Sequence, residues 1–209
     1  VENDVINNAF GKTVAMIAQD VFEQLNERSD IYSLVQLSKI IDFGNITKKI
    51  TDDNNVEIEI LSEDFNLEDF LSSLQHYAPY VKRGKVKYEK SLNTILKIIK
   101  KNTDYSYDRN KLKHGAILNI LIKKIKSPNK LSVVTTNYDT LIEDEIKNLQ
   151  IVSKDEDLPH TNSNRMLIKM HGDFKNKNIV LKKSDYDNYE KNFPLISTLI
   201  KGLFTTNTV

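Results

Sequence analysis

The stretch LSVVTTNYD, residues 131–139, decides the fold class of this chain. Its opening run, LSVVTT, is β-branched, too short for a helix and bounded by turn residues, so it predicts a buried strand. The run ends in the polar motif TTNYD, which precedes a helical pattern at 140–148. A strand that passes through a polar turn into a helix is a repeating unit of α/β sheets.

The same arrangement occurs again downstream. RMLIKM at 165–170 predicts a second strand, and it ends at the motif HGD. The remaining elements expected here are short strands at 151–153 (IVS) and 178–182 (NIVLK), a helix over 184–192 with Ser184 as its cap, and a helix over 194–204 with Pro194 in its first turn. Strands that alternate with helices predict an α/β, Rossmann-like sheet, largely parallel and flanked by helices.

The part of the chain before this sheet predicts a layer of helices. Asn66 is placed to cap a helix that runs through Tyr77, and Pro79 ends it. Apolar residues at three- and four-residue steps predict the other helices, and one alternating segment predicts a short strand in an exposed excursion. These helices are expected at 12–26, around Leu34 to Ile41, at 88–101 and at 108–126, and the alternating segment lies at 56–60.

A length of 209 residues suits one domain with a helical insertion. We expect a single domain, 1–209, in three parts. These are N-terminal helices with the exposed excursion at 1–64, the helical layer at 65–127, and the α/β part at 128–209.

The composition excludes several classes of function. Thirty Lys and Arg against 29 Asp and Glu give a net charge of +1, so no overall field attracts nucleic acid or an anionic membrane. The absence of cysteine excludes disulfides, a thiolate nucleophile and sulfur-ligated zinc. No apolar run approaches the roughly 18 residues that span a bilayer, and the start lacks an export signal, so a cytoplasmic location is expected.

Both polar motifs lie at the carboxyl ends of predicted strands. Open α/β sheets bind their ligands at these ends. TTNYD brings two hydroxyls, an amide and a carboxylate into one turn, a polar cluster that is costly to bury without partners. In HGD, His171 can exchange a proton near neutral pH, and Gly172 permits close approach of a ligand. The residue types therefore predict a polar site, and they do not identify its ligand.

Simpler interpretations stay open at this point. A strand-end Asn-Tyr-Asp can be a helix cap with an Asx turn, and a histidine before glycine can be a surface or capping residue. The aromatic residues Tyr186, Tyr189 and Phe193 follow a helical step and predict a core stripe more readily than a site.

The run VVTTNYDTLIE, followed by RMLIKMHGDFKNKNIVLKKSDYDNYEKN, resembles the sirtuin-like NADase domains of bacterial anti-phage defence proteins, of the defence-associated sirtuin type. The resemblance covers residues 131–209, and it extends more weakly to FNLEDFLSSL at 65–74. TTNYD, HGD, a following strand and DYDNY in this order form its specific signature.

The resemblance implies that Asn137 positions the nicotinamide ribose and a water molecule, while His171 acts as general base or orients the ribose. Asp139 would hold the nicotinamide carboxamide, with Thr135 and Thr136 lining the pocket. Gly172 completes the residues expected to bind NAD+. NAD+ would be the substrate, the products would be nicotinamide and ADP-ribose, and neither zinc nor another cofactor is implied.

The sequence departs from this family in its glycines. The family opens with a GAG-type loop, whereas the nearest candidate here is Ala9 to Thr13, which has one glycine. The family's GYS-type turn would follow Val209, so edge elements are expected to be missing at both termini. Deacetylation is disfavoured because sirtuin deacetylases carry a cysteine-bound zinc module.

The function expected from the resemblance is an effector that depletes NAD+ in a phage-infected cell. The alternatives are a non-catalytic module of a larger defence complex, which senses NAD or ADP-ribose or serves assembly, and an oligomerisation domain built on the helices at 66–126. The implied partners are further copies of the chain, further domains or a sensor or ATPase subunit, and a phage-derived trigger.

Overall fold

The computed structural model describes residues 14–26, 47–51, 53–103, 120, 123, 131–146, 148–160 and 165–206. The chain divides into two compact units, one formed by Lys12–Asn102 and the other by Val1–Gly11 with Thr103–Val209. We call them the helical unit and the sheet unit. The single domain in three parts that the sequence predicts stays a prediction.

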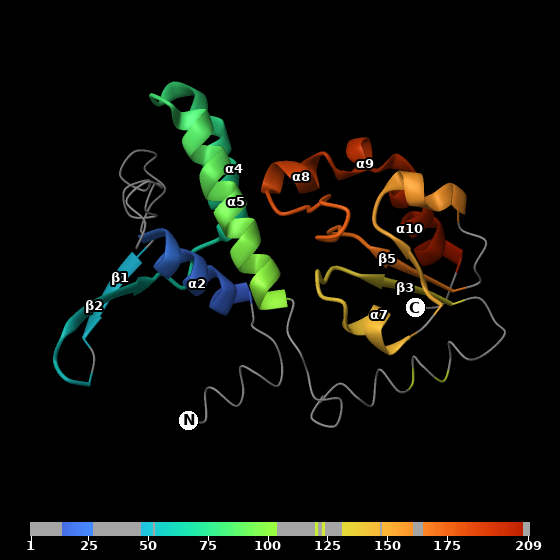
Figure 1. Cartoon of the computed structure of the whole chain (residues 1–209), viewed down its shortest axis with the longest axis horizontal. Coiled ribbons are helices and arrows are strands. Elements are labelled where there is room, and N and C mark those ends of the chain that lie inside the picture. Colours follow the sequence, from blue (N-terminus) through green and yellow to red (C-terminus); the bar gives the residue numbers. More distant parts are fainter. Residues whose placement is uncertain are drawn as a thin grey trace. The chain divides into compact units, whose positions relative to one another are not determined.

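The described residues of the helical unit form three α-helices, one 3₁₀ helix and a β-hairpin, and Figure 1 shows their arrangement within the unit. Strands β1 and β2 pair in an antiparallel register that sets Thr47 opposite Leu61. The sequence predicted the second of these strands and missed the first. The elements of this unit are α2 (Val14–Asn26), β1 (Thr47–Thr51), β2 (Glu57–Leu61), α4 (Leu67–Tyr77), the 3₁₀ helix η1 (Ala78–Tyr80) and α5 (Gly84–Thr103).

The predictions for three helices of this unit are confirmed, since α2, α4 and α5 correspond to the patterns at 12–26, 66–77 and 88–101. The short helix predicted around Leu34 to Ile41 lies outside the described residues, as does the segment Ala9 to Thr13. The helix predicted at 108–126 also lies outside them, except for its helical residues Ile120 and Lys123.

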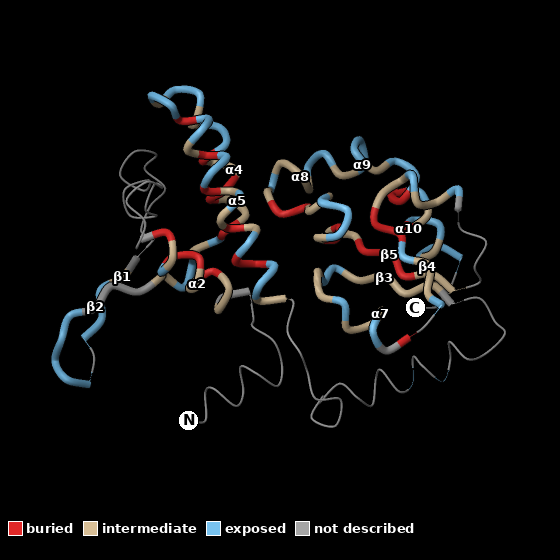
Figure 2. The backbone as a smooth tube through the Cα atoms, in the orientation of Figure 1, coloured by how far each residue is buried: buried red, intermediate tan, exposed pale blue. Residues whose placement is uncertain are grey.

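The core of the helical unit lies along one side of each helix (Figure 2). Its buried side chains recur at three- and four-residue steps because this spacing brings them to the same helix face. They are Ala18, Val21, Phe22 and Leu25 in α2, Leu67, Phe70, Leu71 and Leu74 in α4, and Tyr88, Ile95, Ile98 and Ile99 in α5. Each large aliphatic or aromatic side chain of this kind contributes about 1.5–3 kcal/mol by leaving water.

Helix α4 begins as the sequence predicted. The Asn66 side-chain oxygen accepts hydrogen bonds from the backbone N–H of Glu68 at 2.9 Å and of Asp69 at 3.0 Å. Both N–H groups belong to the first turn, where no carbonyl of the helix can accept them. Asn66 therefore supplies acceptors that the helix itself lacks.

Asn66→Ala is expected to lower the free energy of unfolding by about 1 kcal/mol, because the first turn loses its cap. Thermal denaturation followed by circular dichroism measures this loss. Asn93→Ala is the matched control, since Asn93 is an exposed residue within helix α5. An equal loss of stability in both variants would contradict the assigned role of the cap.

In the part of the sheet unit that the structure describes, three strands pair in parallel, and Figure 1 shows the sheet. They are β3 (Leu131–Thr135), β4 (Gln150–Val152) and β5 (Arg165–Lys169), and they lie in the order β3-β5-β4. The helices of this unit whose bounds the structure describes are α7 (Leu141–Glu145), the 3₁₀ helix η3 (Asp155–His160), α8 (Lys183–Asp187), α9 (Tyr189–Asn192) and α10 (Pro194–Thr206). The helix predicted at 140–148 is thus shorter than expected.

Alternation along β5 directs its side chains to two helices. Ile168 is fully buried and forms a core with Val152 of β4 and with Ile196 and Ile200 of α10. Lys169 points to the opposite face because successive side chains of a strand alternate, and there it pairs with Glu143 of α7. The sheet therefore has a helix on each face, and the predicted α/β, Rossmann-like class with a parallel sheet is confirmed.

The strand predicted at NIVLK, residues 178–182, is wrong, because this segment has no strand structure. The Val180 N–H donates to the carbonyl of His171 at 2.9 Å, within a loop that folds back on itself. The prediction of Ser184 as a cap is also wrong. Helix α8 begins one residue earlier, and the Asp185 carboxylate accepts from the N–H groups of Leu181 and Lys182 at 3.2 and 3.0 Å.

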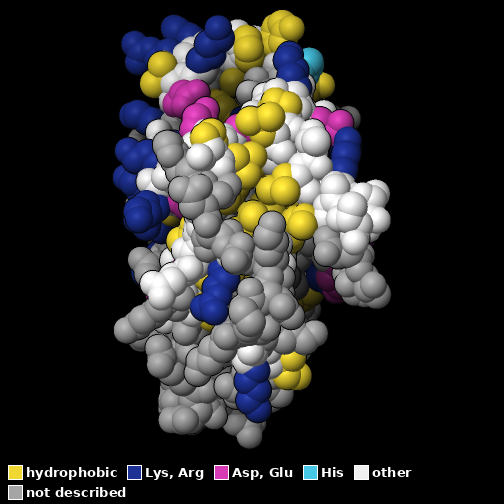
Figure 3. All heavy atoms as spheres, turned by 90° about the vertical axis from the view of Figure 1, so that its right-hand side faces the viewer, with side chains coloured by type: hydrophobic (Ala, Val, Ile, Leu, Met, Phe, Trp, Pro, Cys, Tyr) yellow, Lys and Arg dark blue, Asp and Glu magenta, His cyan; other side chains and the backbone are white. Residues whose placement is uncertain are grey.

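Hydrophobic side chains also gather on part of the surface of the molecule (Figure 3). In the sheet unit, the large hydrophobic side chains of Ile151, Leu195 and Phe204 are exposed. Helix α10 thus presents apolar side chains to the outside as well as to the core. Among the described residues, no helix has the length and apolar character needed to cross a membrane.

Candidate functional site

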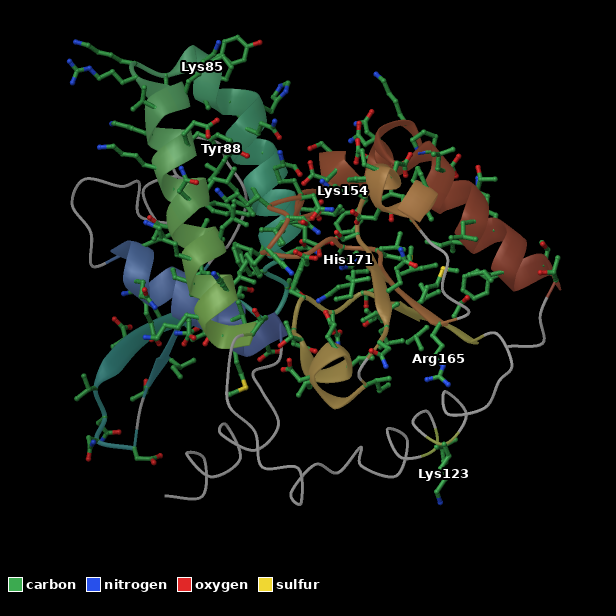
Figure 4. The ribbon with its side chains drawn as sticks, turned by 45° about the vertical axis from the view of Figure 1, so that its right-hand side comes forward. Lys85, Tyr88, Lys123, Lys154, Arg165 and His171 are labelled. Atoms are coloured by element: carbon green, nitrogen blue, oxygen red, sulfur yellow. The ribbon has the colours of Figure 1, made fainter. Side chains whose placement is uncertain are left out.

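The two polar motifs follow adjacent strands. β3 and β5 pair in parallel with Thr135 opposite Lys169, and the Met170 N–H donates to the Thr135 carbonyl at 2.9 Å. Figure 4 shows both ends of β5, with Arg165 at its start and His171 just beyond its end. TTNYD and HGD therefore leave the sheet at the same edge, where an α/β sheet binds its ligands.

Within TTNYD, two side chains hold the turn. The Thr135 hydroxyl accepts from the Asn137 N–H at 3.1 Å, and Oδ1 of Asp139 accepts from the Leu141 N–H at 3.1 Å as α7 begins. The Asx turn considered from the sequence is thus present at Asp139. Oδ2 of Asp139 makes no hydrogen bond to another described residue.

Thr136 and Asn137 lie at the exposed tip of the turn. Within the described part of the chain, the side-chain amide of Asn137 makes no hydrogen bond. An amide that the fold does not use is available to a ligand, with its oxygen as acceptor and its nitrogen as donor.

Gly172 shapes the second motif. Its φ of 75° lies in the left-handed region, and its N–H donates to the Lys169 carbonyl at 3.0 Å. A Cβ at this position would lie 2.0 Å from the carbonyl oxygen of Asn178. The close approach that glycine permits here is therefore between two parts of the protein backbone.

Asp173 is largely buried and supports the loop that follows His171. Its carboxylate accepts from the Asn176 N–H at 2.7 Å and from the Asn176 side chain at 3.2 Å. The Asn176 side chain also donates to the Ser153 hydroxyl at 2.7 Å, and the Asn178 side chain donates to the Ser153 carbonyl. These bonds connect the HGD loop to the end of β4.

The His171 ring lies among aromatic side chains. Its centroid is 5.9 Å from that of Tyr138 and 5.2 Å from that of Tyr186, the latter in an edge-to-face arrangement. The Tyr138 hydroxyl donates to the Val180 carbonyl at 2.6 Å, which fixes the first ring. These two aromatic neighbours restrict the orientation of the imidazole.

Sequence reasoning missed the contact of Tyr186 with His171, since helical spacing assigned it to a core stripe with Tyr189 and Phe193. The core role holds for the other two, whose rings pack at 5.1 Å and lie against the α10 core. Burial, and secondarily the charge of Asp155, raises the pKa of Tyr189 to about 12. This phenol is therefore neutral at physiological pH. The available signal for Tyr186 was its place in the DYDNY segment of the family signature.

Lys169 was also missed, because strand alternation does not predict a charged side chain in a sheet core. Its side chain is 1% exposed and forms an ion pair with Glu143 of α7 at 2.7 Å. Its ammonium also donates to the carbonyls of Tyr138 at 3.4 Å and Asp139 at 2.7 Å. A buried cation thus lies directly under the TTNYD turn.

Comparison with known proteins agrees with this geometry. Residues 131–209 match the family model described as the SIR2-like domain. The chain is also 44% identical, over 94 residues, to Defense-associated sirtuin 2 of Bacillus subtilis. That similarity covers 41% of this chain and 9% of the length of the relative. The resemblance inferred from the sequence is confirmed for this part of the chain.

Proposed function

We propose, on the premise that residues 131–209 form a SIR2-like domain, that this chain is an NAD+ glycohydrolase. It would cleave NAD+ into nicotinamide and ADP-ribose. One observation carries the proposal, namely that Asn137 and His171 follow paired parallel strands and so leave the sheet at the same edge. Asn137 is exposed and its side-chain amide makes no hydrogen bond to another described residue, which supports a role toward a ligand.

The proposed reaction breaks the bond between the ribose C1′ and the nicotinamide nitrogen, and the bonding electrons leave with nicotinamide. The ribose carbon becomes oxocarbenium-like, and a water oxygen then bonds to it. Asn137 would orient the ribose and this water through its amide dipole. The neutral imidazole of His171 would accept the proton that the water loses, and later release it to solvent.

The other predicted residues would complete the site. Asp139 would accept a hydrogen bond from the nicotinamide carboxamide through Oδ2, because Oδ1 already accepts one from the Leu141 N–H at the start of α7. Thr136 lies exposed at the tip of the turn and would contact the ligand, whereas Thr135 and Gly172 would act through the shape of the two loops. This chemistry requires neither zinc nor another cofactor, since amide and imidazole supply the groups it uses.

In the cell, the proposed activity would deplete NAD+ as an effector of anti-phage defence. The name of the Bacillus subtilis relative, Defense-associated sirtuin 2, supports this setting. That relative is far longer than the matched part of this chain. The proposal therefore includes additional domains, or a sensor or ATPase subunit, beside the SIR2-like domain. Association with further copies of the chain and activation by a phage-derived trigger belong to the same proposal.

A non-catalytic module that senses NAD or ADP-ribose is the second candidate. The observation in its favour is that the six glycines of the sequence lie far apart, so that no G-x-G loop is present to hold a pyrophosphate. Such a module would bind the nucleotide and leave it intact.

Incubation of the chain with NAD+ is expected to release nicotinamide and ADP-ribose in equal amounts, measured by liquid chromatography. EDTA should leave the rate unchanged because no metal takes part in the proposed step. Binding of NAD+ in a calorimeter without release of nicotinamide would favour the sensing module instead. If the chain neither bound NAD+ nor released nicotinamide, both candidate functions would be contradicted.

A further inference from the structure

The buried ammonium of Lys169 has acceptors on two different elements. Two of them are carbonyl oxygens of the TTNYD turn, at Tyr138 and Asp139, and the third is the carboxylate of Glu143 on α7. An ammonium carries three N–H donors, so these three acceptors match its capacity. Glu143 is itself only 14% exposed, which keeps water from replacing it easily.

This arrangement constrains the turn. Burying a charge is costly unless its hydrogen bonds and its counter-charge are in place. Any movement of the turn that withdraws the Tyr138 and Asp139 carbonyls would leave part of the ammonium unpaired. The turn is therefore most stable in the one conformation that directs both carbonyls at Lys169.

Asn137 lies directly before these two residues in the chain. On its other side, its N–H is bonded to the Thr135 hydroxyl at 3.1 Å. Consecutive Cα atoms are about 3.8 Å apart, so a shift of the Tyr138 peptide moves Asn137 as well. Asn137 is thus held on both sides while its side chain stays exposed. Lys169 also precedes His171 by two residues, so one strand end carries both.

We infer that Lys169 is a positioning residue that holds Asn137 in place relative to His171 through the carbonyls of the turn. It does not touch the substrate in this role. That Lys169 fixes the conformation of the TTNYD turn follows from its contacts alone. That it thereby supports catalysis rests on the proposed function.

Lys169→Met tests this inference, because methionine has a similar length and removes every donor. Lys201→Met is the matched control. Lys201 forms an ion pair with Glu190 at the same distance of 2.7 Å, but the two side chains are 63% and 71% exposed. Exposed pairs of this kind contribute little to stability.

In the full chain, Lys169→Met is expected to lower kcat for nicotinamide release by about 100-fold, the size of effect that small misplacements of reacting groups produce. KM should stay within about 3-fold of the parent value, since Lys169 makes no contact with substrate in this role. Lys201→Met should leave both constants unchanged. A folded Lys169→Met protein with the parent kcat would overturn the inference.

Hydrogen–deuterium exchange separates this outcome from a failure of the proposed function. Lys169→Met should speed exchange at least about 10-fold within residues 136–146 and leave β3 and β5 protected, whether or not the parent cleaves NAD+. Exchange that is faster throughout the chain, or exchange within residues 136–146 that is no faster than in the parent, would overturn the positioning role. Should the variant not fold, the double substitution Lys169→Met with Glu143→Gln removes the unpaired carboxylate, and the same expectations apply to it.

Discussion

Asn137→Ala is expected to reduce nicotinamide release by about 10²–10³-fold, the loss typical of removing one oriented dipole from a reacting centre. The same variant should keep the Tm of the parent, because the Asn137 side chain makes no hydrogen bond to another described residue. Chromatography of the products and thermal denaturation measure the two effects. Loss of activity without loss of stability is what distinguishes a ligand contact from a structural residue.

His171→Gln is expected to reduce nicotinamide release by about 10²–10⁴-fold, because an amide cannot accept a proton from water at neutral pH. Glutamine is used in place of alanine because the His171 ring packs against Tyr138 and Tyr186. A variant with a side chain of comparable size limits the loss of this packing.

Asn192→Ala and His76→Ala are the controls for these two substitutions, since both residues are exposed and belong to α9 and α4. Both control variants should release nicotinamide at the parent rate. If either site variant also retained the parent rate, the assignment of the pair would be wrong. If the Asn137→Ala variant lost both activity and thermal stability, Asn137 would instead have a structural role.

Gly172→Ala is expected to lower the free energy of unfolding of the sheet unit, whereas the same change at Gly202 is not. Left-handed backbone costs a residue with a side chain about 1–3 kcal/mol, and overpacking adds about 1–3 kcal/mol more. The added Cβ would lie 2.0 Å from the Asn178 carbonyl oxygen, which belongs to backbone and cannot turn aside as a side chain can. The loop from His171 to Val180 must therefore shift.

Thermal denaturation should show a fall in Tm of at least about 5 °C for Gly172→Ala, given the usual relation between free energy and Tm for a chain of this length. Gly202→Ala is the control, since a Cβ at Gly202, within α10, meets no atom within 4 Å. Alanine is a better helix former than glycine, so this control should be neutral or stabilising. A Gly172→Ala protein as stable as the control would show that the loop has another conformation of similar energy.

The strands of the sheet unit were predictable where local sequence dictates them. The runs at 131–135 and 165–169 both form parallel strands, as predicted. Leu167 and Ile168 of the internal strand β5 are buried, whereas the described side chains of β3 are only half-buried. The cap at Asn66 was predictable for the same reason, because it depends on residues two and three positions away.

NIVLK shows the limit of that reasoning. Val180 is 2% exposed and Leu181 7%, so their apolar character correctly signalled burial. Their backbone groups, however, bond to the loop itself and to Asp185 instead of to a neighbouring strand. Apolar character predicts that a side chain leaves water, and it does not determine which partners the backbone has.

The sequence by itself determined the two motifs and the strands β3 and β5 that precede them, because these depend on neighbours in the chain. Only the tertiary structure decided that Lys169 lies under the TTNYD turn and that Tyr186 packs against His171. The Lys169 contact joins residues 30 positions apart. Such contacts follow from how strands pair and helices cover them, and no local pattern encodes that pairing.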